Sequence, residues 1–118
     1  MINNELIVGF FRAVNEHNTD QMADLFTEDA EFYFPKTQPL IGKEKILRFF
    51  KILFRQYPEL SFNIERLIIE GNQAAVHWTN RGKNRKGDPY ENEGVTIFEE
   101  EEDMIVFMSD FFKDTGKF

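Results

Sequence analysis

The spacing of hydrophobic residues changes partway along this chain, and that change limits the folds open to it. In residues 4–16 apolar side chains recur at helical spacing, and the same spacing returns in residues 43–57. Residues 60–112 read instead as successive strands, with a two-residue hairpin signal at Gly71-Asn72. Helices followed by antiparallel strands are typical of the α+β class, in which helices cover one face of a sheet.

The expected elements follow the order α-α-β-α-β-β-β-β. A helix over residues 4–16 and a short helix that starts at Thr19 or Asp20 and includes Phe26 precede a strand that Pro35 ends. Residues 36–42 are expected to form a loop. The third helix covers residues 43–57 and stops before Pro58. The last four strands are expected over residues 60–70, 73–82, 90–100 and 103–112. At 118 residues, the chain is expected to form one domain over residues 1–118.

Composition and charge argue against several classes of protein. The net charge of −7 repels phosphate, so we do not expect nucleic-acid binding, although basic residues gather in 43–55 and 81–86. No apolar run approaches the ~20 residues of a membrane span, and the first residues lack a basic leader. Without cysteine the chain has neither disulfides nor thiolate ligands. We expect a cytoplasmic protein that does not bind membranes.

Phenylalanine is unusually common, with 14 residues in the chain. Phenylalanine rings often line pockets for apolar ligands, and they equally often fill a solid core. The first interpretation predicts an aromatic pocket for a small, largely apolar molecule. The residues expected to line that pocket are Phe10, Val14, Met22, Phe26, Phe32, Phe34, Phe49, Phe50, Leu53, Tyr57, Thr79, Met108 and Phe112.

Asp110 is the first candidate for a catalytic role. In the strand expected over residues 103–112 it shares a face with Met108 and Phe112. Burial among apolar side chains would raise the pKa of its carboxyl group toward neutrality, which suits a general acid or base. The alternative is a solvated carboxylate at a strand end.

His77 is the second candidate. It shares a face with Ala75 and Thr79, and we assign that face to the pocket. A neutral imidazole next to a carboxylate forms a proton-transfer pair, so we expect His77 to act with Asp110. The alternative is a core histidine whose ring nitrogens are hydrogen-bonded by neighbours.

The later strands are apolar on both faces, although three helices can cover only one face. Since Val76, Trp78 and Ile97 are assigned to the uncovered face, they would contact water in a monomer. We therefore expect a homodimer through the outer face of the sheet.

No metal site or cofactor site is expected. The chain has two histidines and no HExxH or comparable spacing. The acidic run at residues 99–103 lacks the alternating ligands and central glycine of a calcium loop, and is typical of a solvated hairpin tip. Any chemistry would have to come from side chains alone.

Four stretches carry a resemblance to a known family: NTDQMADLFTEDAEFYFP, LIGKEKILRFF, AAVHWTNRG and IVFMSDFF. Together they resemble the nuclear transport factor 2-like superfamily and, within it, the SnoaL-like and ketosteroid isomerase-like domains. The resemblance covers nearly the whole chain. It implies a cone, in which three helices and a curved, mostly antiparallel sheet enclose one deep, largely apolar pocket.

The resemblance allows the catalytic positions of known members to be compared with the residues of this chain. The proton-transferring positions of the steroid isomerases fall on Phe10, Phe34 and Val95, so steroid isomerisation by that route is not expected. Of the Asp-Arg-Asp set of limonene epoxide hydrolase, only the last-strand aspartate is matched, by Asp110, because the other two positions fall on His77 and Thr79. The SnoaL-like cyclases, with an acid/base aspartate on the last strands, are the nearest match.

Two classes of function therefore stay open. In the first, the protein binds a small apolar molecule, and Asp110 and His77 transfer protons without a cofactor, as in a cyclisation, isomerisation or hydration. In the second, the protein is a non-catalytic ligand-binding or protein-interaction module. A cavity filled by phenylalanine rings would favour the second.

Overall fold

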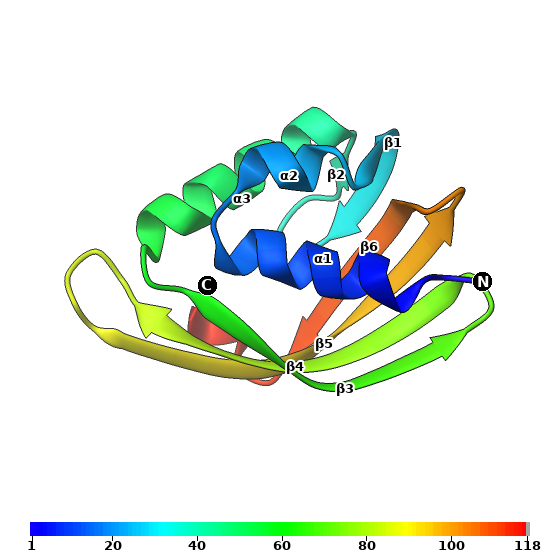
Figure 1. Ribbon diagram of the computed structural model, residues 1–118. Helices are drawn as coiled ribbons and strands as arrows, with labels where there is room; N and C mark the ends of the chain where they lie inside the picture. Colours follow the sequence, from blue (N-terminus) through cyan, green and yellow to red (C-terminus); the bar gives the residue numbers. More distant parts are fainter. Residues whose placement is uncertain (118) are drawn as a thin grey trace.

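A computed structural model of the protein describes residues 1–117 and has the α+β architecture expected from the sequence (Figure 1). Three helices and six strands follow one another, and a short turn of 3₁₀-helix, Thr115–Lys117, comes last. The helices and strands are α1 (Asn4–Asn15), α2 (Thr19–Ala23), β1 (Phe26–Tyr33), β2 (Leu40–Ile41), α3 (Lys43–Gln56), β3 (Ser61–Glu70), β4 (Gln73–Lys83), β5 (Pro89–Glu101) and β6 (Met104–Phe112).

The strands form one sheet in the order β2-β1-β6-β5-β4-β3. Strands β3 to β6 are successive antiparallel neighbours, whereas β1 pairs with β6 in parallel. The sheet is strongly curved, and all three helices lie on its concave side (Figure 1). We call the side that the helices cover the inner face and the opposite side the outer face.

Side-chain caps explain where the first two helices begin. The Asn3 side chain accepts a hydrogen bond from the backbone N–H of Glu5, and Asn18 accepts one from Gln21. Between the helices, His17 adopts a left-handed conformation with φ of 53°. Its ring stacks on Phe54 at 4.3 Å and lies 2.9 Å from the carbonyl oxygen of Leu60, so this histidine ties the turn to the core.

Two expectations about the first half of the chain were wrong. The short strand β2 lies where the sequence suggested only a loop, and it pairs with β1 through Glu31 and Phe32. Phe26, expected on the second helix, is instead the first residue of β1 and pairs with Ile105. Tertiary pairing decides both features, because neither segment has enough alternating residues to be recognised as a strand alone.

Aromatic rings occupy the space between the helices and the inner face. Phe10 on α1 makes edge-to-face contacts with Phe26, Phe50 and Phe98 at centroid distances of 5.4–6.1 Å. Phe32 on β1 stacks on Phe50 at 5.6 Å. Such pairs add stability beyond the area they bury, so this cluster is the centre of the core.

No helix among the described residues is both long enough and apolar enough to cross a membrane.

Candidate functional site

Asp110 lies on the inner face of β6, on the same side as Met108 and Phe112, as the alternation of the sequence predicted. Its cross-strand partner is Thr96 on β5, and the Thr96 hydroxyl donates a hydrogen bond of 2.6 Å to Asp110 Oδ1. The indole N–H of Trp78 on β4 donates in turn to Thr96 Oγ1 over 2.8 Å. A chain of hydrogen bonds thus crosses three strands and ends at the carboxyl group.

The Trp78 indole fixes the direction of these hydrogen bonds. An indole N–H can only donate, so Thr96 Oγ1 must accept from Trp78 and can use its own proton only toward Asp110. Oδ1 of Asp110 is therefore an acceptor. Its Oδ2 is left as the oxygen that can carry a proton or contact another molecule.

Burial raises the pKa of Asp110 to about 7, and the hydrogen bond from Thr96 lowers it by a smaller amount. The charged carboxylate loses its hydration among apolar side chains, which favours the neutral acid. Near pH 7 both forms are populated, and this is the condition under which a carboxyl group can serve as general acid or general base.

The surroundings of Asp110 are not completely closed. The residue keeps some accessible surface, and so do Phe34, Phe49 and Phe112. Phe34 contacts both Phe49 and Phe112, with ring centroids 4.8 Å and 5.2 Å apart. Phe112 shares the inner face with Asp110, so these partly exposed rings lie on the same side of the sheet as the carboxyl group.

The structure contradicts the expected pairing of Asp110 with His77. His77 lies on the outer face of β4, and its Nε2 is 2.5 Å from Oε2 of Glu93 on β5. Lys113 Nζ contacts the other oxygen of Glu93 at 2.8 Å. These contacts, from Lys113 first and then from His77, lower the pKa of the Glu93 carboxyl group. The two candidate residues therefore stand on opposite sides of the sheet.

The two faces of β4 are the reverse of those expected, and this changes three other assignments on the strand. Thr79, expected in the pocket, lies on the outer face with His77. Val76 and Trp78, expected at a dimer interface, lie on the inner face and are 0% and 2% exposed. They are core residues of this chain, so they cannot contact a second copy.

The other residues expected to line a pocket are on the inner side, but most of them pack against one another as core. Only Phe34, Phe49, Tyr57 and Phe112 remain partly exposed. The buried members are Phe10, Val14, Met22, Phe26, Phe32, Phe50, Leu53 and Met108.

Asn80 has a property that sequence reasoning missed. It is 5% exposed, and neither its side-chain oxygen nor its side-chain nitrogen has a hydrogen-bond partner. Asn80 is two residues from Trp78 along β4, so it shares the inner face. Buried amides almost always find partners, which makes this one a candidate ligand contact.

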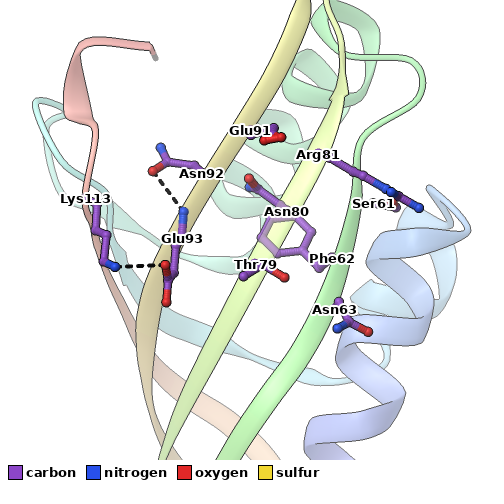
Figure 2. A pocket seen from close by; sticks show the side chains of 10 residues that line it. All are labelled: Ser61, Phe62, Asn63, Thr79, Asn80, Arg81, Glu91, Asn92, Glu93 and Lys113. Atoms are coloured by element: carbon purple, nitrogen blue, oxygen red, sulfur yellow. Dashed lines mark hydrogen bonds and ion pairs between the residues drawn. The ribbon is translucent and has the colours of Figure 1, made fainter.

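Two hollows in the surface border strands β3 to β5. One, of about 800 Å³, takes residues from all three strands and from Lys113 (Figure 2). A second, of about 530 Å³, lies over the outer face beside His77, Val95 and Phe111. The residues lining the first are Ser61, Phe62, Asn63, Thr79, Asn80, Arg81, Glu91, Asn92, Glu93 and Lys113.

Metal binding finds no support in the described part of the chain. Within residues 1–117, no three histidine, aspartate or glutamate side chains come together as a ligand set. The closest arrangement, His77 with Glu93, offers two ligands, and Lys113 already neutralises the glutamate.

Known proteins share this fold and part of the sequence. Residues 7–108 match a family described as the SnoaL-like domain. A putative SnoaL-like polyketide cyclase from Jannaschia sp. CCS1 superimposes with a TM-score of 0.84, with 20% identity, over 92% of this chain and 83% of that one. An NTF2-like protein from Anabaena variabilis also gives 0.84, with 21% identity over 96% and 87% of the two chains.

A match to a curated protein is shorter. Over 50 residues the chain is 32% identical to the orange carotenoid-binding protein of Synechocystis. That segment covers 42% of this chain and 16% of the cyanobacterial protein, so the likeness concerns a small part of it.

Proposed function

This chain belongs to the SnoaL-like domain family, and we propose that it binds a small, largely apolar molecule on the inner face of its sheet, beside Asp110. The observation that carries the proposal is the buried Asp110 carboxyl group, whose pKa is raised to about 7 and whose Oδ1 is held by Thr96. A titratable group in an apolar site is a recurring mark of functional sites.

The proposed chemistry is proton transfer by Asp110 alone, without His77. Oδ2 would donate a proton to, or accept one from, the bound molecule in a cyclisation, isomerisation or hydration. The positions that carry this chemistry in steroid isomerases are Phe10, Phe34 and Val95 here, and none can exchange a proton. The Jannaschia protein is named as a putative polyketide cyclase, which supports a polycyclic or polyketide-like substrate class.

A second candidate function is non-catalytic binding. The observation that favours it is the dense packing of Phe32, Phe49 and Phe50, whose ring centroids lie 5.3–5.6 Å apart in the space where relatives with a pocket would hold a ligand. The curated match is named as carotenoid-binding, and binding an apolar pigment needs no proton transfer.

Calorimetric titration with para-phenylphenol, an apolar molecule with one hydroxyl group, tests the proposal. We expect the wild-type affinity to rise with pH through a midpoint of about 7, because the phenol donates a stronger hydrogen bond to a carboxylate than to a neutral acid. In the Asp110→Asn variant the affinity should not change with pH. Equal pH profiles for the two proteins would exclude Asp110 as the contact, and no binding to either would exclude the proposed site.

We also propose that two copies associate through the outer face. Ile68 and Phe111 are 65% and 60% exposed there, beside the hollow that contains Val95. Both side chains line that hollow, so a twofold axis through it would bring the exposed apolar side chains of two copies together.

The Phe111→Glu variant should be monomeric at a concentration where the wild type is a dimer, because it places a charge in an apolar contact. Light scattering after gel filtration measures the mass. Ile52→Glu is the matched control, because Ile52 is 45% exposed on α3, away from the sheet, and its replacement should leave the dimer intact. A monomeric wild type at micromolar concentration would refute the interface.

A further inference from the structure

The buried amide of Asn80 makes no hydrogen bond of ordinary geometry within the described chain. Its Nδ2 and Oδ1 atoms both lack hydrogen-bond partners, although the side chain is 5% exposed. A buried amide without partners destabilises a fold, and a leucine of similar size would not. Its presence on the inner face therefore calls for a partner that the folded chain does not supply.

A neighbouring asparagine, Asn92, has a structural role on the same face of the sheet. Asn92 is the cross-strand partner of Asn80, and both atoms of its side-chain amide are hydrogen-bonded. It accepts from the backbone N–H groups of Glu93 and Asp114 and donates to the Asp114 carbonyl oxygen. The Asn92 side-chain nitrogen also donates to the Tyr90 hydroxyl over 3.3 Å. The Asn80 amide lies close enough to that hydroxyl to lower the pKa of Tyr90, but its geometry falls short of an ordinary hydrogen bond.

The register of the strands gives the positions of Asn80 and Asp110 relative to each other on the sheet. Asp110 pairs with Thr96, which pairs with Val76, and Asn80 is four residues farther along the same strand as Val76. On a flat sheet this places the two positions about 13 Å apart along the strands and about 10 Å apart across them. The sheet is concave on this face (Figure 1).

The surface between these two polar groups is aromatic. Trp78 and Phe112 face each other across Gly94, with ring centroids 6.3 Å apart, and Phe62 contacts Trp78 at 5.0 Å. Asn80 is also among the residues that line the hollow of about 800 Å³ in Figure 2.

We propose that Asn80 is a ligand contact, and that the ligand is an elongated apolar molecule with an oxygen function at each end. One oxygen would contact Oδ2 of Asp110, and the other would complete the hydrogen bonds of the Asn80 amide. A hydroxyl group suits Asn80, because it can donate to Oδ1 and accept from Nδ2. This inference rests on the proposed binding site beside Asp110 and adds the length and the second polar group of its ligand.

Two probes that differ by one hydroxyl group test the inference. Para-phenylphenol has one, whereas para,para′-biphenol has one at each end of the same rigid rings. We expect the wild type to bind the diol at least tenfold more tightly by calorimetry. The Asn80→Leu variant should lose this preference and still bind para-phenylphenol as the wild type does. The Thr79→Val variant, changed on the opposite face of the same strand, should keep the preference.

Thermal unfolding supplies the readout that separates a binding role from a structural one. Asn80→Leu should melt at the same temperature as the wild type or higher, because it removes an unpartnered polar group. If Asn80→Leu does not fold, Asn80→Ala makes the same comparison of probes with less bulk.

Three outcomes would overturn the inference. An Asn80→Leu protein that keeps the preference for the diol would mean that the amide does not contact the ligand. A wild type that binds both probes equally would mean that no second polar contact exists, although the site beside Asp110 would stand. A wild type that binds neither probe would remove that site, and the role of Asn80 with it.

Discussion

Replacing Gly94 by alanine is expected to lower the free energy of unfolding by about 3 kcal/mol, or the melting temperature by roughly 10 °C. A Cβ atom at this position would lie 2.4 Å from the Phe111 carbonyl oxygen, 2.7 Å from Phe112 Cβ and 2.8 Å from Trp78 Cζ2. The backbone oxygen cannot move without disturbing the pairing of β5 with β6. Urea denaturation followed by circular dichroism measures the change.

Gly9 provides the matched control for this substitution. It lies in α1, where an added Cβ meets no atom within 4 Å. Gly9→Ala should stabilise the protein, by up to about 1 kcal/mol, because alanine is the better helix former. If Gly94→Ala were as stable as the wild type, the close approach of Trp78 and Phe112 over Gly94 would be wrong, and with it the aromatic band between Asp110 and Asn80.

The stability of the wild type is expected to fall between pH 4 and pH 7 by an amount that the Asp110→Asn variant does not lose. The folded protein holds the Asp110 proton up to pH of about 7, whereas the unfolded chain releases it near the ordinary value of 3.8. Between these values the folded state binds more protons, so stability decreases as pH rises. The full difference is about 4 kcal/mol as an upper limit, since each pH unit is worth about 1.4 kcal/mol.

Urea titrations of both proteins from pH 4 to pH 8 isolate this contribution, because every other carboxyl group is common to the two. Thr96→Val provides a second comparison. It removes the hydrogen bond that lowers the pKa of Asp110, so the loss of stability should extend to higher pH. Parallel pH profiles for the wild type and Asp110→Asn would show that the carboxyl group is hydrated and ordinary, and would remove the basis for acid/base chemistry.

Local patterns were enough to predict the place of Asp110 and the order of the elements except the short strand β2. Helical spacing and caps depend on neighbours within a few residues, and so does the hairpin turn at Gly71-Asn72. The alternation that puts Asp110 beside Met108 and Phe112 depends only on the strand itself. These features needed no knowledge of what packs against them.

Alternation divides a strand into two sets of side chains but does not say which set the helices cover. On β4 the helices cover the set that contains Val76 and Trp78, and not the expected set that contains His77 and Thr79. The covered set is the larger and more apolar of the two, which makes it the better candidate for the core.

The rest of the site depends on contacts between strands. Thr96 reaches Asp110, and Glu93 reaches His77, only because β5 pairs with its neighbours in one particular register. A register is set by the whole sheet, so neither partner could be read from its own segment. Asn80 carries no sequence signal at all, because an asparagine in a strand looks the same with and without hydrogen-bond partners.

The parallel pairing of β1 with β6 has a consequence for how the protein is made. β6 separates β1 and β2 from the rest of the sheet, so this early hairpin has only the helices to pack against until the ribosome has synthesised the residues after Met104. β6, the strand that carries Asp110, is therefore the strand that completes the sheet. Long-range pairing of this kind slows folding, and the edges of β1 and β5 that β6 covers stay exposed in the meantime.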